Sequence, residues 1–563
     1  MSKWIYCFAA CLLSCAITHS SLANPTTFDA DPNEMARIHF CGTIKSSTDS
    51  SAASFLTVAN RPASAAWREK ILTNLSKAPF EIFKKQLAAG TANDFSGELR
   101  PLIVDLYQYE SFIEAMSSTT QAPEWMLAIK LPKARANVWQ STLSKVLTSW
   151  TSIAPAPING TGYSGWQLKK QHSPDTLVCL QSGEWLLFGW GDGSLSLQSI
   201  LLKRLSHSGN PGTPLKEFWI EGHFNMASIM AHYPNPLLSS LFGPKPPRVD
   251  LEVKGSGTYI RPEVDLLFDH PLNVKLDPWL IPTNLIQNRF TSLMVARGVQ
   301  DWLGRMPFVQ SLKLPSVPNQ FSSWSRSGIL LEHNLAFPAQ DSRTYLAKAK
   351  DGIINTINLE FIGNDSLVEA DWEGNSIGLK EFPLSPFSIH PVKQMNGEYI
   401  LTGLVPLGNS RVPQKLPEEL LKQIFTDPKL LSYSWELTDE RLNQWLNLFG
   451  LNSLARGRSG ASRTDPGQKC YEQIHGDLGP CATIYTLEAP DKIKILRNAT
   501  VGLSGFELAL LQYWADSPSF PMAPVFPAKT IRNISGKAPF APQPPPATAP
   551  STPIVPIPPP RAH

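Results

Sequence analysis

Residues 431–450 of the chain, LSYSWELTDERLNQWLNLFG, carry the pattern that decides the fold prediction. Their first part alternates apolar and polar side chains, with apolar residues at Leu431, Tyr433, Trp435 and Leu437. A period of two is typical of a β-strand that has one buried face. The stretch therefore predicts a strand that lies on a core.

A helix is predicted to follow this strand directly. Thr438 can cap its N-terminus, and Asp439 and Glu440 in the first turn interact favourably with the helix dipole. Apolar residues then recur at positions i, i+3, i+4 and i+7, which are Leu442, Trp445, Leu446 and Phe449. We expect Gly450 to end the helix, because glycine favours the conformation that follows a helix C-terminus.

The same order of strand and helix recurs along the chain. Further units are predicted over residues 125–150, 218–232, 290–302 and 329–354, and helical patterns over 65–87 and 95–116 precede them. A hairpin is predicted from residues 483–488 and 492–497. The helix after this hairpin begins with a capping box of Ser504 and Glu507.

These features predict an α+β protein with repeated strand–helix units on mainly antiparallel sheets. Antiparallel pairing is expected because hairpins intervene and the strands alternate rather than being apolar throughout. We interpret the chain as two related halves that meet near residue 285, within the Pro-containing stretch His270–Asn288. The predicted divisions are a signal peptide (1–23), a polar lead-in (24–52), two α+β domains (53–285 and 286–525) and a disordered Pro-rich tail (526–563).

Composition excludes several classes of protein. The chain has 563 residues, of which 17% are charged and 42% are hydrophobic, so it is not a charged disordered protein. Its 50 Lys and Arg residues nearly balance its 47 Asp and Glu residues, which gives a net charge of +3. A chain this close to neutrality has no electrostatic footprint for nucleic acid, and we expect no nucleic-acid partner.

The N-terminus has the pattern of an export signal. Lys3 supplies the positive end, Trp4–Ile17 form an uncharged and mostly apolar run, and Ser21-Leu22-Ala23 offers small residues where a signal peptidase cleaves. The apolar run is shorter than the roughly 20 residues that a membrane-spanning helix needs. We therefore predict an exported protein, periplasmic or secreted, with no transmembrane span in the mature chain.

A second reading of the same region stays open. Leu12-Leu13-Ser14-Cys15 resembles a lipoprotein cleavage box, in which Cys15 would carry the lipid and anchor the protein in the envelope. Leu13 fits this box poorly, because the position favours smaller residues. Lipidation at Cys15 is the alternative to cleavage after Ala23.

Four cysteines lie beyond the signal, namely Cys41, Cys179, Cys470 and Cys481. Cys470 and Cys481 bracket a short, turn-rich loop that a disulfide could close in an oxidising compartment. Two buried thiols that never meet are the alternative. The sequence has no CxxC motif and no paired-histidine spacing, so no metal site is predicted.

The sequence contains no SxxK or HExxH motif, and the GxSxG spacing occurs once, at residues 374–378. Two acidic clusters stand out instead, and no cofactor is indicated. Glu369, Asp371 and Glu373 alternate along one predicted strand, so their carboxylates share a face. The second cluster consists of Glu263, Asp265, Asp269 and His270. Paired carboxylates across a cleft can hydrolyse glycosides, whereas a solvated strand face is the favoured alternative.

The C-terminal tail has a composition of its own. Pro550, Pro553 and Pro556 show the PxxP spacing, and the proline content favours an extended polyproline II chain that cannot build a core. Such a chain is either a ligand for an aromatic groove, here of an envelope protein, or a spacer.

Several short stretches resemble an uncharacterised family of exported bacterial proteins. They are Ala78-Pro-Phe80, Leu99-Arg-Pro-Leu102 with Asp105, Gly165-Trp-Gln-Leu168, Pro282-Thr-Asn284 with Ala296-Arg-Gly298, Pro318-Asn-Gln320, and Gly502–Leu508 with Tyr513-Trp514 and Ser519-Phe-Pro521. The resemblance spans most of residues 55–525. It implies an exported protein but no catalytic or binding residue, because no activity is known for that family.

The sequence as a whole favours a non-enzymatic, envelope-associated binding or scaffold protein. The alternative is a secreted, carboxylate-dependent hydrolase that acts on glycans. In that case Glu369, Asp371 and Glu373 would face a cleft rather than open solvent.

Overall fold

A computed structural model describes residues 33–521 apart from short segments. The segments that it leaves out are 84–86, 88–92, 118–122, 170–175, 192–195, 213–217, 287–289, 327–331, 363–369, 374–375, 380–387, 404–415, 456–464 and 518–519. The predicted signal peptide with Cys15, and the Pro-rich tail, lie outside the described residues.

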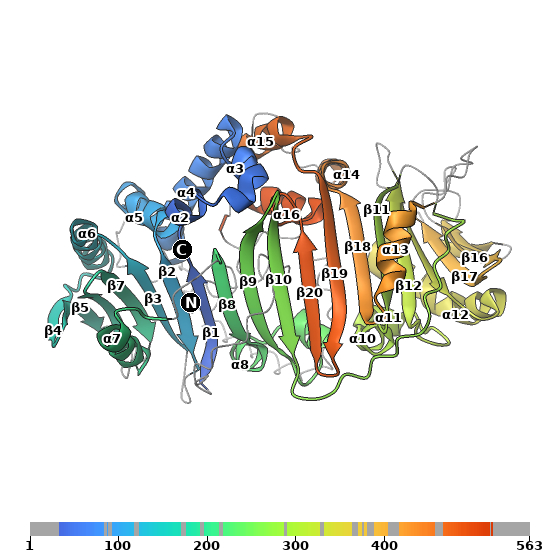
Figure 1. The fold of residues 1–563 in the computed structure, drawn as a ribbon, viewed down its shortest axis with the longest axis horizontal. Coiled ribbons are helices and arrows are strands. Elements are labelled where there is room, and N and C mark those ends of the chain that lie inside the picture. The colour runs from blue at the N-terminus through green and yellow to red at the C-terminus, as the bar shows by residue number, and fades with distance from the viewer. Residues whose placement is uncertain are drawn as a thin grey trace, which may run out of the picture.

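The described residues form one antiparallel sheet of 20 strands, seen face-on in Figure 1. From one edge, the first half runs through β4 (Ala156–Gly160), β5 (Tyr163–Lys169), β6 (Thr176–Ser182), β7 (Trp185–Gly191), β3 (Glu124–Lys130), β2 (Ser111–Met116), β1 (Glu34–Phe40), β8 (Ile220–Asn225), β9 (Arg248–Ser256) and β10 (Tyr259–Leu267). The second half continues through β20 (Lys492–Asn498), β19 (Pro480–Ala489), β18 (Leu430–Leu437), β11 (Phe290–Arg297), β12 (Gln320–Arg326), β13 (Glu332–Pro338), β17 (Gly397–Gly403), β16 (Ser388–Gln394), β15 (Ser376–Leu379) and β14 (Ala370–Glu373).

The strand order is the same in both halves. Read from the outer edge inwards, the first half is β4-β5-β6-β7-β3-β2-β1-β8-β9-β10, and the second is β14-β15-β16-β17-β13-β12-β11-β18-β19-β20. The halves meet where β10 pairs with β20, and there Glu263 lies opposite Leu496. β1 thus corresponds to β11 and β10 to β20. A connection in one half corresponds to the connection between the matching strands of the other.

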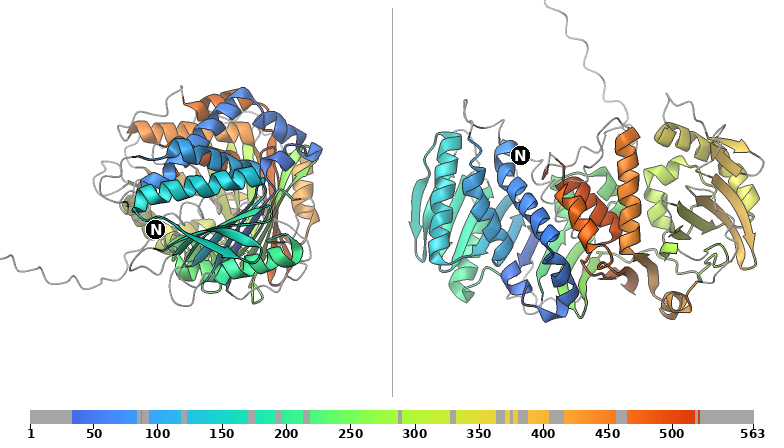
Figure 2. Two further views of the ribbon diagram at one scale, coloured as in Figure 1. Left: turned by 90° about the vertical axis from the view of Figure 1, so that its left-hand side faces the viewer. Right: turned by 90° about the horizontal axis from the view of Figure 1, so that it is seen from above.

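Helices cover the two faces of the sheet unequally. Two of them, α7 (Ser196–Ser208) and α13 (Glu418–Thr426), lie on the front face, toward the viewer of Figure 1. The other helical elements lie behind the sheet or along its rims, as Figure 2 shows from above. They are α2 (Thr43–Ser46), η1 (Ser50–Ala52), α3 (Ala53–Ala59), α4 (Pro62–Phe83), α5 (Ser96–Gln108), α6 (Lys133–Thr151), α8 (Met226–His232), α9 (Pro236–Phe242), α10 (Gln300–Arg305), α11 (Pro307–Ser311), α12 (Ser342–Thr356), η3 (Ile357–Ile362), α14 (Thr438–Ala455), α15 (Pro466–Ile474) and α16 (Gly505–Ala515).

Each half has one core behind its outer strands and another in front of them. Behind the sheet, Trp139 of α6 packs in the first half and Leu346 of α12 in the second. In front, Leu201 of α7 and Ile424 of α13 pack on the strands in the same way. The apolar stripes of the helices thus bury both faces of strands such as β3 and β7, whereas the edge strand β4 is largely exposed.

The central strands are apolar behind and polar in front. In β9, the side chains of Val249, Leu251 and Val253 are buried in the core behind the sheet. Asp250 and Glu252 alternate with them and therefore point to the front. No described helix covers the front of these strands between α7 and α13 (Figure 1).

The structure confirms the strand–helix unit on which the fold prediction rested. β18 ends at Leu437, and α14 begins directly at Thr438. The terminal hairpin of β19 with β20 and the capping box of Ser504 and Glu507 are also confirmed. The prediction that Gly450 ends α14 is wrong, because this helix continues to Ala455. One glycine costs a helix only about 1 kcal/mol, which the neighbouring packing outweighs.

Three other predictions need correction. Part of the stretch 24–52, predicted as a polar lead-in, forms β1, which pairs with β2 and β8. The helical pattern over 95–116 ends at Gln108, and Ser111–Met116 form β2. The predicted antiparallel sheets are a single sheet that continues across the expected junction near residue 285. All three errors concern pairings between strands that are distant in sequence.

Gly42 follows β1 at a position where a side chain does not fit. Its φ is +81°, and an added Cβ would lie 2.4 Å from the backbone oxygen of Gln108. Gly162 has the same φ but no atom within 4 Å of an added Cβ. We expect Gly162→Ala to cost about 1–2 kcal/mol of left-handed strain. Gly42→Ala should cost clearly more, through the added backbone clash. Urea unfolding measures both losses of stability, and equal losses would contradict the prediction.

Candidate functional site

Charged side chains gather on the front of β1, β8, β9, β10 and β20. We call this group the central polar face. Because every second residue of a strand points to the same side, and paired residues share that side, the register places these side chains together. Its members are Arg37, His39, Glu221, His223, Arg248, Asp250, Glu252, Lys254, Arg261, Glu263, Asp265, Lys492 and Lys494.

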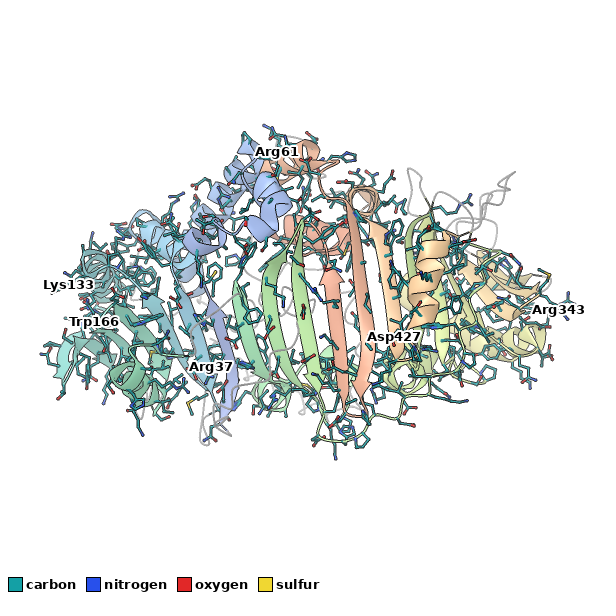
Figure 3. All side chains as sticks on the ribbon, viewed as in Figure 1. Arg37, Arg61, Lys133, Trp166, Arg343 and Asp427 are labelled. Atoms are coloured by element: carbon teal, nitrogen blue, oxygen red, sulfur yellow. The ribbon has the colours of Figure 1, made fainter. Side chains whose placement is uncertain are left out.

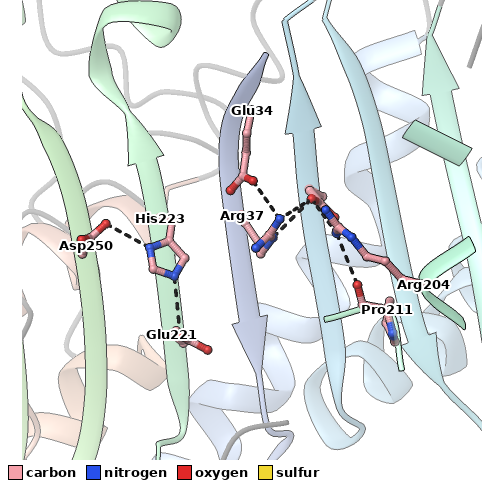
Figure 4. A network of polar contacts seen from close by, with 8 residues as sticks. Glu34, Arg37, Arg204, Pro211, Glu221, His223 and Asp250 are labelled. Atoms are coloured by element: carbon pink, nitrogen blue, oxygen red, sulfur yellow. Dashed lines mark hydrogen bonds and ion pairs between the residues drawn. The ribbon is translucent and has the colours of Figure 1, made fainter. Parts of the chain in front are cut away.

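Arg37 links the central polar face to helix α7. Its guanidinium donates to Glu34 at 2.7 Å and to Glu114 at 2.9 Å. Arg204 of α7 donates to both oxygens of Glu114 at 2.9 Å (Figure 4). Figure 3 shows Arg37 on the front of the sheet. Since Glu114 is 3% exposed, two guanidinium groups compensate its loss of hydration.

His223 lies between two carboxylates on neighbouring positions of the face. Its Nδ1 is 3.0 Å from Asp250 Oδ1, and its Nε2 is 3.6 Å from Glu221 Oε1 (Figure 4). Burial opposes the charge, but the hydrogen bonds and charges of Asp250 and Glu221 outweigh it and raise the pKa of His223 to about 9. At neutral pH this imidazole is therefore a cation rather than a general base.

Two carboxylates at the centre of the sheet are committed to cations. Glu263 is 2.7 Å from Arg261 Nε and 3.5 Å from Lys254 Nζ. Asp265 is 2.9 Å from Lys492 Nζ. Burial raises the pKa of Asp265, an effect that Lys492 opposes. Lys254 and Lys492 reach these carboxylates from the adjacent strands β9 and β20, whereas Arg261 lies two residues from Glu263 on β10 itself.

The paired charges form an inner and an outer layer. Glu263 and Asp265 are 4% and 8% exposed. Arg248 and Arg261 are 50% and 35% exposed, and Lys254 is 28% exposed. In the pairs of Glu263 and Asp265, the carboxylates are thus more buried than their cations. The most exposed paired charges of the central polar face are the cations Arg248 and Arg261, with Glu221 and Asp250 at 28% and 22%.

A small enclosed cavity lies within this face, lined by Arg37, His39, Phe112, Glu221 and His223. Its volume is about 10 Å³, which is close to the space for one water molecule. No substrate of ordinary size fits inside it. A partner of this face would therefore bind on its surface.

Of the first predicted acidic cluster, the structure describes the side chain of Asp371. Asp371 is exposed on the edge strand β14 and accepts a hydrogen bond from the backbone N–H of Trp372. Glu369 and the side chain of Glu373 lie outside the described residues.

The second cluster is divided by the end of a strand. Glu263 and Asp265 are buried on the central polar face. Asp269 and His270 lie beyond the end of β10, where they form an exposed pair at 2.6 Å. The predicted cluster of four is therefore two ion-paired carboxylates and a separate surface pair.

A serine–histidine group on the back of the second half was not predicted. His333 lies 3.0 Å from Ser323 Oγ and 2.8 Å from Ser325 Oγ. Burial, together with the charge of Arg441, lowers the pKa of His333 to about 4. The imidazole is neutral at pH 7 but is a weak base, so it does not suit activation of a serine nucleophile. The alternation of serines in β12 was the one sequence signal for this group.

Of the two alternatives for Cys470 and Cys481, the structure shows free buried thiols and not a disulfide. The Sγ of Cys470, on α15, lies 3.4 Å from the Oγ of Ser64, on α4. Cys481 lies opposite Glu436 in the β18–β19 pair. The two thiols thus belong to different layers. Burial raises the pKa of Cys481 and of Cys179 to about 12 and that of Cys41 to about 11.

No group of three or more His, Cys, Asp or Glu side chains suited to a metal ion occurs among the described residues. Within the same residues, the helices fall short of the length and apolar character that a membrane crossing requires. In comparisons with known proteins, no family model, curated protein or solved structure matches the chain.

The raised pKa of His223 predicts a pH dependence of stability. A folded-state pKa of about 9, above the ordinary histidine value of 6.5, means that the contribution of His223 to stability is fully present below pH 6.5 and is lost as the pH rises through 9. We expect the wild type to lose stability as the pH rises from 8 to 10, and His223→Gln to lose less over the same range. Thermal unfolding between pH 6 and 10 measures both. His207→Gln, at an exposed site, is the control and should keep the wild-type slope.

The four buried cysteines predict low thiol reactivity. Protein recovered from an oxidising compartment should show Cys41, Cys179, Cys470 and Cys481 as unmodified thiols after brief alkylation under native conditions, because buried, protonated thiols are poor nucleophiles. All four should be alkylated in denaturant. Mass spectrometry distinguishes the two states. A Cys470–Cys481 disulfide peptide would contradict this structure.

Proposed function

We propose that the protein is an exported, envelope-associated binding or scaffold protein that recognises its partner through the central polar face. The observation that carries this proposal is the long front surface between α7 and α13, which no described helix covers and which is built from layered ion pairs. The resemblance to exported bacterial proteins supports export. Periplasmic or secreted location, or a lipid anchor on Cys15, are alternatives within this proposal.

The partner best suited to this surface is a protein segment that carries carboxylates. Arg248, Lys254 and Arg261 are the more exposed charges, so carboxylates of a partner would meet cations first. Each of these cations already has a carboxylate within about 3.5 Å. Cations that are already partly neutralised would displace few of the counterions condensed on a phosphate backbone, which disfavours a nucleic acid as the partner. Spaced side-chain carboxylates on a protein match this pattern better.

The state of the buried groups supports binding rather than acid–base chemistry on this face. A general base must be free to accept a proton near neutral pH. Glu114 is held by Arg37 and Arg204, and Asp265 is held by Lys492. His223 is protonated. These groups are thus occupied in holding the surface together.

A pull-down from the native envelope tests the proposal. The full chain should enrich a partner that the double variant Arg248→Glu/Lys254→Glu loses by about tenfold or more, because charge reversal turns attraction into repulsion. Lys145→Glu, which reverses an exposed cation on α6, is the matched control and should keep the partner.

A chain truncated after Phe526 separates the contribution of the Pro-rich tail. If enrichment of the partner is lost on truncation of the tail but is unaffected by the double variant of the central polar face, recognition lies in the tail. The proposal for the central polar face then fails. Glycan hydrolysis that disappears in Asp371→Ala would instead favour the hydrolase hypothesis.

A further inference from the structure

The corresponding connections of the two halves differ at one place. In the second half, α14 and α15 join β18 to β19, and α16 follows β20. In the first half, α8 and α9 join β8 to β9 in the same way. After β10, however, the described residues 268–286 contain no helix. The first half therefore has counterparts of α14 and α15 but none of α16.

Helix α16 fills a groove on α14 and α15. Leu508 and Ala509 of α16 are buried in one core cluster with Leu442 of α14 and Ile474 of α15. The approach is close, because a Cβ on Gly505 would lie 2.6 Å from the backbone nitrogen of Leu442. An apolar helix with a small residue at its N-terminal end thus completes this side of the second half.

A cation from the other half holds the C-terminal end of α16. Asp516 accepts a hydrogen bond from Lys70 Nζ at 2.9 Å. Lys70 belongs to α4, in the connection between β1 and β2. The ion pair is partly buried, with Asp516 9% exposed. The groove of the second half therefore consists of two helices of its own and of residues from the first half, namely Val58 and Ala63 of the same cluster and the cation Lys70.

The matching place in the first half is an open groove with a volume of about 590 Å³. It is lined by Ala227, Met230 and Ala231 of α8, by Ser239 and Ser240 of α9, and by Arg305 of α10. Figure 1 shows α8 and α10 at the lower side of the sheet, opposite α14 and α16 at the upper side.

One lining residue of this groove, Met230, has a counterpart under α16. α8 and α14 each begin directly after their strand, so Met230 takes the position of Leu442. Leu442 is 3% exposed beneath α16, whereas Met230 is only half-buried. Arg305 comes from the connection between β11 and β12, which corresponds to that of Lys70. It is exposed and has no ion pair with any described residue.

We propose that this groove, formed by α8, α9 and Arg305, binds an apolar helix of a partner protein whose C-terminal end carries a carboxylate. Its parts correspond to three of those that hold α16 in the second half, namely α14, α15 and Lys70. α16 of another copy is not the occupant, because Leu508 and Ala509 are 5% and 0% exposed in their own groove. The site lies on the opposite side of the sheet from the central polar face, so it is independent of the proposed function.

A labelled peptide with the sequence of Ser504–Asp516 is a direct probe for the full-length chain. Fluorescence anisotropy should show saturable binding of one peptide per chain. Ala231→Trp, which fills the groove, should abolish this binding. Arg305→Glu should weaken it by about tenfold, the usual effect of losing a charge-assisted hydrogen bond. Lys145→Glu is the control and should leave the affinity unchanged.

A charge exchange makes the test specific. A peptide with Asp516→Arg should bind the wild type poorly and recover affinity for the Arg305→Glu chain, because the ion pair is restored with reversed sign. The proposal is overturned if the peptide does not bind at millimolar concentration. It is also overturned if Ala231→Trp leaves binding intact, since the peptide would then be competing for the groove of α16.

Discussion

The backbone pairing of β10 with β20 is the constraint on which the rest of the structure depends. It joins two sets of strands with the same order into one sheet, with Glu263 and Leu496 opposite each other at the junction. Each strand of one half is then separated from this junction by the same number of strands as its counterpart in the other half. The positions of α7 and α13, and of α6 and α12, follow from that arrangement.

The same junction explains why charges lie in the middle of such a wide sheet. Strands such as β3 and β7 are buried on both faces by helices, and their residues are largely apolar. The central strands have their core behind them only, so their front positions are free to be polar. Asp265 and Lys492 then neutralise each other across the junction itself, from different halves.

The sequence was sufficient for features that depend on neighbouring residues. The β18–α14 unit, the terminal hairpin and the Ser504 capping box all arise within short windows, where periodicity and capping act. β1 was missed because its stability comes from β2 and β8, which are remote in sequence. The sequence also indicated Glu263 and Asp265 as members of an acidic cluster. Their ion-pair partners Lys254 and Lys492 could not be identified from the sequence, because the strand register brings them together.

The two edge strands of the sheet affect whether copies of the protein can associate edge to edge. An open sheet ends in strands with unpaired backbone groups, and these can recruit another sheet into a growing fibre. One edge, β4, contains Pro157, which has no N–H to donate. The other, β14, is only four residues long and carries the exposed Asp371. Growth by addition of strands is thus hindered at both ends, and a concentrated solution of this sheet is protected from polymerisation.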